Sequence, residues 1–124
     1  MKENYNTSDH LNDLRKRPQM YVGEVRLDFI SSYLTGYEMA MKIAGVNDPS
    51  MPDFSGFREF VRKKYQFFGS SNGWANMILA VTIGFDPTDM HWGDFRNKII
   101  SPEQHQRSVT EFFNLLDEYQ STQT

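Results

Sequence analysis

The sequence contains no cysteine among its 124 residues, which excludes disulfide bonds, a thiolate nucleophile and zinc sites built on cysteine ligands. Long apolar runs are also missing. The longest one extends from Met77 to Ile83 with Thr82 inside it, far short of the ~20 residues that a membrane-spanning helix needs. The first residues, MKENYN, hold no apolar segment that could act as a signal peptide. We therefore expect a cytoplasmic protein that does not enter the membrane.

Motifs that identify a reaction are absent as well. The histidines His10, His91 and His105 do not stand at the i, i+3 or i+4 spacing that places two metal ligands on one helix face. The segment GSSNG at 69–73 has no P-loop lysine and follows no predicted strand. No Gly-x-Ser-x-Gly motif occurs, and few carboxylates are paired for acid–base chemistry. We expect no enzyme, no catalytic residue, no metal and no cofactor.

One group of residues leaves an enzymatic or metal-binding alternative open. His91 lies close in the sequence to Asp86, Asp89 and Asp94, and these four side chains could together bind a metal ion. A simpler interpretation is that Asp86 caps a helix, that Asp89 interacts favourably with the helix N-terminus and that His91 is a surface residue. We favour the simpler interpretation.

The charge is small and unevenly distributed. Thirteen basic and sixteen acidic residues give a net charge of −3, so we expect no binding to nucleic acid. Residues 67–124 contain three basic and seven acidic residues, a net charge of −4. The short basic runs at 15–17 and 62–64 stand beside apolar helical positions and acids, so we interpret them as solvated faces. An acidic half increases the association rate with a basic partner.

Apolar residues recur at spacings of three and four, which predicts an all-α fold of five to six helices in a single domain over residues 1–124. The polar ends, 1–7 and 121–124, are expected to be flexible. The predicted helices are one that starts at Ser8 or Asp9 and ends before Pro18, one over 26–44 that Gly45 ends, one from Asp53 to Gly69, one over 74–85, one that follows Asp86-Pro87, and one that follows Ser101.

Several of these helices carry more specific expectations. Residues 74–85 could form a buried strand and give an α+β fold, but Ser71 offers a helix cap and no partner strand is evident, so we predict a helix. Gly36 inside the helix over 26–44 is expected to allow close packing. The helix after Asp86-Pro87 is expected to carry Trp92, Phe95 and Ile99. The last helix is expected to begin with a Ser101–Gln104 capping box. Its apolar stripe consists of Val109, Phe112, Phe113, Leu116 and Tyr119.

A set of landmarks spread over residues 14–119 resembles a known family. They are the early RPQMYVG at 17–23, LTGY at 34–37, FREFV at 57–61 leading to GWA at 73–75, and FFNLLDEY at 112–119. The chain resembles the small bacterial immunity proteins that neutralise polymorphic toxins, including those of contact-dependent growth inhibition. The resemblance implies a protein without enzymatic activity that binds a cognate toxin domain and covers its active site or blocks its substrate.

The resemblance supplies no contact residues, so the candidate toxin-binding residues are chosen by charge and by position near turns. An acidic inhibitor suits a basic toxin such as a nuclease, because carboxylates take the place of substrate phosphates and an aromatic side chain excludes water. The candidates are Asp86, Asp89, Asp94, Asp117 and Glu118, with Trp92 as the aromatic anchor.

Two further functions stay open beside the immunity hypothesis. One is a small helical adaptor that binds another protein and has no enzymatic activity. The other is the enzyme or metal protein centred on His91. The free chain is expected to be a monomer or a weak homodimer, because no heptad pattern predicts a coiled coil.

Overall fold

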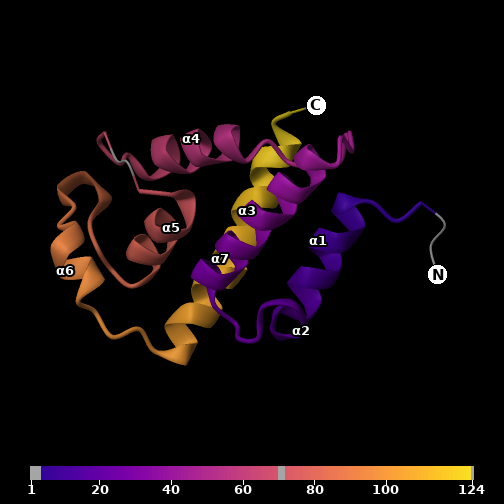
Figure 1. Ribbon diagram of the computed structural model, residues 1–124. Coiled ribbons are helices and arrows are strands. Elements are labelled where there is room, and N and C mark those ends of the chain that lie inside the picture. Colours follow the sequence, from indigo (N-terminus) through magenta and orange to yellow (C-terminus); the bar gives the residue numbers. More distant parts are fainter. Residues whose placement is uncertain (1–3, 70–71, 124) are drawn as a thin grey trace. The chain divides into compact units, whose positions relative to one another are not determined.

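The computed structural model describes residues 4–69 and 72–123 (Figure 1). These residues contain seven α-helices, one 3-10 helix and no strand, so the prediction of an all-α fold is confirmed. The chain divides into two compact units, Met1–Pro52 and Asp53–Thr124, and each is described separately. The single domain over residues 1–124 stays a prediction.

The first unit consists of α1 (Thr7–Lys16), α2 (Pro18–Val22) and α3 (Leu27–Ile43). Helix α1 contacts α2, and α2 contacts α3. The short α2 was not expected; Pro18 occupies its first turn, where a missing N–H has no cost. The buried side chains of this unit include Leu11, Leu14, Leu27, Ile30 and Leu34.

The start of α1 differs from the prediction. The cap is Asn6, not Ser8 or Asp9, and Asp9 instead completes a capping box by accepting a hydrogen bond from the Asn6 N–H. Thr7, grouped with the flexible end in the sequence, is buried. Its N–H and Oγ1 donate to Asp48 Oδ2 at 2.8 and 2.7 Å. These hydrogen bonds and those from Ser50 hold the pKa of Asp48 well below its usual range.

Helix α3 agrees with the predicted helix over 26–44 in its bounds. Gly45 follows it with a φ of 70°, the left-handed conformation expected of a glycine that ends a helix. The prediction about Gly36 is wrong, because this residue is exposed and a Cβ added there would meet no atom within 4 Å.

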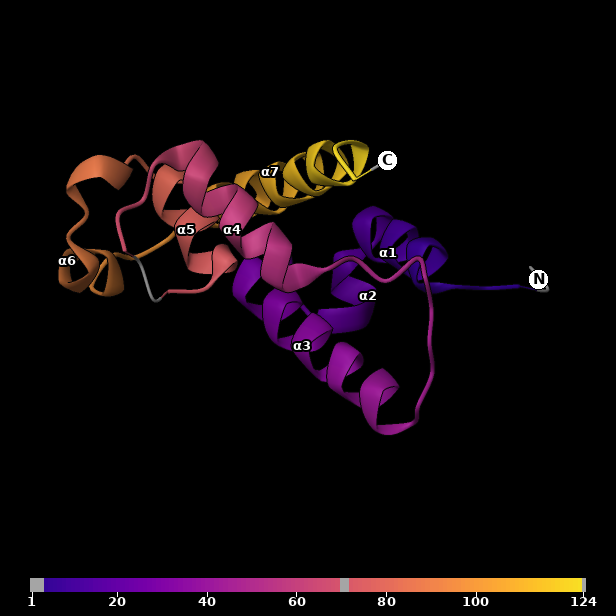
Figure 2. The same cartoon turned by 90° about the horizontal axis from the view of Figure 1, so that it is seen from above.

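The second unit contains α4 (Phe54–Tyr65), α5 (Trp74–Thr82), η1 (Pro87–Asp89), α6 (Trp92–Arg96) and α7 (Pro102–Ser121). Helix α5 lies against both α4 and α7 (Figure 2). Most of its side chains are therefore buried, among them Met77, Ile78, Leu79 and Ala80. This burial on several sides explains the unbroken apolar run. The choice of a helix over a strand is confirmed for Trp74–Thr82, whereas residues 83–85 lie beyond the helix.

Aromatic rings form the core of the second unit. The indole of Trp74 stacks on Phe112, with centroids 4.7 Å apart. Phe57 meets both rings edge-on, at 5.5 Å from Trp74 and 5.7 Å from Phe112. Such pairs contribute about 0.5–1.5 kcal/mol beyond the burial of their area. The apolar stripe predicted for the last helix is buried as expected, and the Ser101–Gln104 capping box is present.

The predicted end of the first helix in the second unit is wrong. Helix α4 begins after its Asp53 cap as expected, but it ends at Tyr65 and not at Gly69, since Gln66 takes up the left-handed conformation with a φ of 64°. Helix α5 follows Gly73, while the proposed cap Ser71 lies outside the described residues.

The segment after Asp86-Pro87 is not one helix. It forms η1, an extended link at Met90 and His91, and then α6. Phe95 is buried as expected, whereas Ile99 lies beyond α6 with 97% of its side chain exposed. Separately, none of the helices in the described part of the chain has the length and apolar character that a membrane span requires.

Candidate protein-binding surface

Four of the six predicted contact residues stand in the segment 86–94, which we call the acidic segment. Asp86 caps η1: its Oδ1 accepts hydrogen bonds from the N–H of Thr88 at 2.9 Å and from the Thr88 hydroxyl at 2.7 Å. These hydrogen bonds favour the charged carboxylate, and they lower the pKa of Asp86. The main role of Asp86 is therefore to form the turn.

Trp92 and Phe95 attach the acidic segment to the rest of the second unit. Trp92 is the first residue of α6, and its indole stacks on Phe67 with centroids 5.8 Å apart. It also meets Phe95 edge-on at 5.4 Å. Phe95 belongs to a buried cluster with Leu79 and Ala80, against which Trp92 packs. Trp92 is half-buried, so part of an indole whose orientation is fixed remains open to a partner.

The carboxylates of Asp89 and Asp94 lie on either side of Trp92 in the chain, and both are exposed. The side chain of Asp89 is 79% exposed, and its Oδ1 lies 3.5 Å from His91 Nε2, an ion pair when the imidazole is protonated. Asp94 stands in the first turn of α6, where an acidic side chain is favourable. Neither carboxylate caps η1 or α6, so an external contact would break no helix cap, although at Asp89 it would compete with His91.

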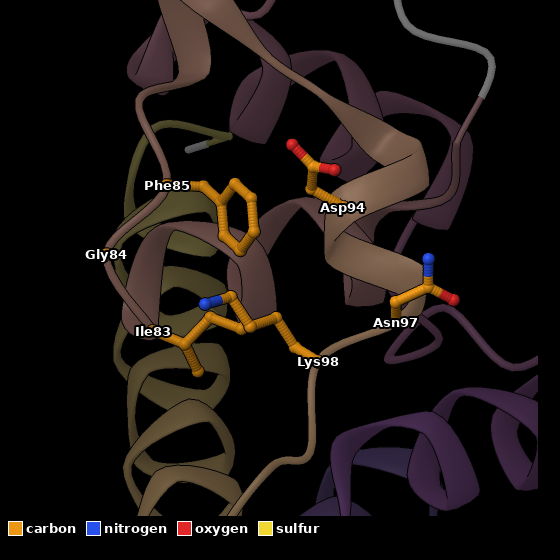
Figure 3. Close-up of a pocket in the computed structure, with 6 residues that line it drawn as sticks. All are labelled: Ile83, Gly84, Phe85, Asp94, Asn97 and Lys98. Atoms are coloured by element: carbon orange, nitrogen blue, oxygen red, sulfur yellow. The ribbon is translucent and has the colours of Figure 1, made fainter.

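The acidic segment contributes to two pockets. One has a volume of about 510 Å³ and is shown in Figure 3. Phe85 and Asp94 approach it from opposite sides, and the side chain of Lys98 extends toward Phe85 (Figure 3); the ammonium lies 5.9 Å from the ring centroid. The lining residues are Ile83, Gly84, Phe85, Asp94, Asn97 and Lys98. This pocket therefore presents one charge of each sign.

The other pocket has a volume of about 340 Å³ and lies beside Trp92. Phe68, Asp89 and Trp92 line it, together with Gly69, Asn72, Pro87, Thr88 and Met90. We call it the Trp92 pocket. Phe68 is 96% exposed, so its ring is open to solvent.

The remaining two candidates, Asp117 and Glu118, lie elsewhere. They stand on the C-terminal part of α7, which is well away from α6 in both views of the unit (Figures 1 and 2). Glu118 accepts hydrogen bonds from Lys64 Nζ at 2.7 and 2.9 Å and links α7 to α4. The six candidates thus form two separate sets.

The sequence analysis missed Phe68 and Ile99 as surface residues. The helix predicted to continue to Gly69 includes Phe68, and the helix expected after Pro87 includes Ile99. Both side chains are almost fully exposed, at 96% and 97%. The early end of α4 frees Phe68, and glutamine is not a residue that predicts such a left-handed end.

A metal site at His91 has no geometric support in the described residues. In that part of the chain, no three His, Asp or Glu side chains are placed to hold a metal ion together. His91 and Asp89 form the single close pair of that group.

Comparisons with known proteins add no assignment. Neither a family model, nor a curated protein, nor a solved structure matches the chain.

Proposed function

We propose that the protein is an immunity protein that binds a cognate bacterial toxin domain, a basic nuclease, and blocks its active site or substrate surface. The observation that carries the proposal is the acidic segment, in which two exposed carboxylates flank a half-buried tryptophan whose ring is fixed by Phe67 and Phe95. Rigid aromatic anchors next to charged side chains are typical of protein-binding hot spots.

The mechanism requires no chemistry from this chain. A nuclease holds its substrate phosphates with Lys and Arg side chains, and carboxylates compete for those groups through charge-assisted hydrogen bonds. Asp89 and Asp94 supply the carboxylates, while Trp92 packs on the toxin and excludes water around them. The net charge of −4 over residues 67–124 attracts a basic partner to this half of the chain.

We expect different roles for the other candidates. Asp86 shapes the segment by capping η1, so its substitution acts on binding through the conformation of the turn. Glu118 is engaged by Lys64 and would have to exchange that partner for a toxin residue. Asp117 stands beside Glu118 on an exposed part of α7. The first contacts to test are therefore Asp89, Trp92 and Asp94.

The test is capture of candidate toxin domains encoded immediately upstream of the gene. The purified protein is expected to bind one of them in a one-to-one complex and to abolish its activity. The double variant Asp89→Asn/Asp94→Asn should bind about ten- to a hundredfold more weakly, since each substitution removes one carboxylate from the interface.

A control variant raises the net charge by the same amount as Asp89→Asn/Asp94→Asn, but outside the acidic segment. Gln120 and Gln123 are exposed at the C-terminal end of α7, and Gln120→Lys/Gln123→Lys changes the net charge by the same two units. We expect this variant to bind like the wild type. An active toxin that a folded protein neither binds nor inhibits would contradict the proposal.

A helical adaptor is the second candidate function. The nearly full exposure of Phe68 and Ile99 favours it, because apolar side chains at a surface suit many protein partners. An adaptor would bind a partner without inhibiting a toxin. Capture of a partner unaffected by the Asp89→Asn/Asp94→Asn variant would favour the adaptor.

A further inference from the structure

Two aromatic residues, Phe68 and Trp92, and the carboxylate of Asp89 are among the residues that line the Trp92 pocket. Trp92 is held in place by its stacking on Phe67, with centroids 5.8 Å apart. Phe68 adds a second ring to the lining and is 96% exposed. Aromatic rings that are fixed and open to solvent attract cations over their faces.

The charge of this pocket is negative. Among the described residues that line it, Asp89 is the one with a formal charge, and the side chain of Asp89 is 79% exposed. His91 Nε2 lies 3.5 Å from the Asp89 carboxylate, so a stronger cation would have to compete with the imidazole. The pocket in Figure 3 differs in charge, because it is lined by the positive Lys98 as well as by the negative Asp94.

We propose that the Trp92 pocket binds an arginine side chain of the protein partner, with the guanidinium on Asp89 and its flat face against the aromatic rings. The partner itself rests on the proposed function; the preference for a guanidinium follows from the pocket. A planar guanidinium stacks on aromatic faces and pairs with a carboxylate through two parallel hydrogen bonds, whereas the ammonium of lysine is a strongly hydrated point charge.

The pocket can be tested without the toxin. The full chain is titrated with N-acetylarginine amide or N-acetyllysine amide, and the indole N–H signals of its two tryptophans are followed by proton–nitrogen NMR. The Trp92 signal should shift and saturate with the arginine compound, about tenfold more tightly than with the lysine compound. The signal of Trp74, which is buried in the core, should not move.

Two matched variants locate the site. Asp89→Asn should weaken binding of the arginine compound about tenfold. Glu103→Gln, which removes an exposed carboxylate in the first turn of α7, should leave it unchanged. Phe68→Ala should weaken it as well, because one of the two rings is removed. Equal affinity for the two compounds, an unmoved Trp92 signal, or an equal loss in Asp89→Asn and Glu103→Gln would overturn the proposal.

The outcomes separate this proposal from the proposed function. If the arginine compound binds as expected but no upstream toxin is captured, the immunity function is wrong and the guanidinium pocket stands. If the toxin is captured and inhibited equally well by wild type and Asp89→Asn, the immunity function stands and the arginine pocket is wrong.

Discussion

At the scale of single residues, two helical glycines differ in the space around them. A Cβ at Gly56 would collide with the hydroxyl oxygen of Tyr119 and would lie 2.8 Å from Asp53 Oδ2. The Tyr119 ring cannot move away easily, because it packs on Phe57 and Phe60 with centroids 5.7 and 5.4 Å away. Gly56 is therefore required by packing.

Gly56→Ala should lower the free energy of unfolding by about 1–2 kcal/mol, because the strain of an overpacked core exceeds the gain in helix propensity. Gly36→Ala is the matched control, since no atom lies within 4 Å of the added Cβ in α3; it should raise stability by about 0.5–1 kcal/mol. Denaturant unfolding followed by circular dichroism measures both. A stabilised Gly56→Ala variant would contradict the packing described for Tyr119.

The sequence could not reveal which acidic residues are engaged within the protein. The charge pattern treated Asp86 and Glu118 as equivalent to Asp89 and Asp94. Asp86 is held by Thr88, a local contact that the Asp-Pro-Thr order suggests. The bond between Glu118 and Lys64 joins residues 54 positions apart, so no local pattern could predict it.

At the scale of helices and loops, capping residues and apolar spacing predicted the long helices well. The Asp53 cap, the Ser101–Gln104 capping box and Gly45 all have their expected roles. These signals are local hydrogen bonds and backbone preferences, so the sequence displays them directly.

The break between η1 and α6 has a tertiary cause. Met90 and Trp92 both pack against the buried cluster of Leu79, Ala80 and Phe95, yet residues two apart point in different directions on a helix. An extended link at Met90 and His91 lets both side chains reach the cluster. Packing against a distant helix thus overrides the local helical spacing.

The contact between α4 and α7 provides a pH-dependent test. The Tyr65 hydroxyl donates a hydrogen bond to Glu111 Oε1 at 3.0 Å. Burial raises the pKa of Tyr65 well above its usual range, and the neighbouring Glu111 carboxylate adds to the shift. A raised pKa means that the neutral phenol is the form that stabilises the fold.

The contribution of Tyr65 to the free energy of unfolding is complete below the pKa of about 10 that tyrosine has in the unfolded chain. It is lost as the pH rises toward the higher pKa of Tyr65 in the folded protein. The free energy of unfolding of the wild type should therefore decrease above about pH 10. That of the Tyr65→Phe variant should decrease less steeply over the same range. Denaturant titrations at a series of alkaline pH values give the two slopes. Identical slopes in wild type and Tyr65→Phe would contradict the role of Tyr65.

At the scale of the whole molecule, charge and burial together direct the proposed interaction. The acidic residues of 67–124 outnumber the basic ones by four, and Asp89 and Asp94 expose their carboxylates in that half. Long-range attraction between exposed charges weakens as the Debye length falls from about 30 Å at 0.01 M salt to about 3 Å at 1 M.

The association rate with the toxin should accordingly fall about tenfold or more across that range of salt, while the dissociation rate changes less. Stopped-flow mixing of the two proteins measures the dependence. The association rate of the Asp89→Asn/Asp94→Asn variant should depend less steeply on salt concentration than that of the wild type. An association rate that salt does not change would show that charge does not guide the encounter.

The proposed function requires the exposed carboxylates of the acidic segment to bind a basic toxin and thereby inhibit it. The most direct measurement compares the affinity of wild type, Asp89→Asn/Asp94→Asn and Gln120→Lys/Gln123→Lys for the upstream toxin domain, with toxin activity assayed in each mixture. We predict tight binding and inhibition by wild type and by the lysine control, and a loss of about ten- to a hundredfold in the aspartate variant. Equal affinity and inhibition for all three proteins would contradict the claim.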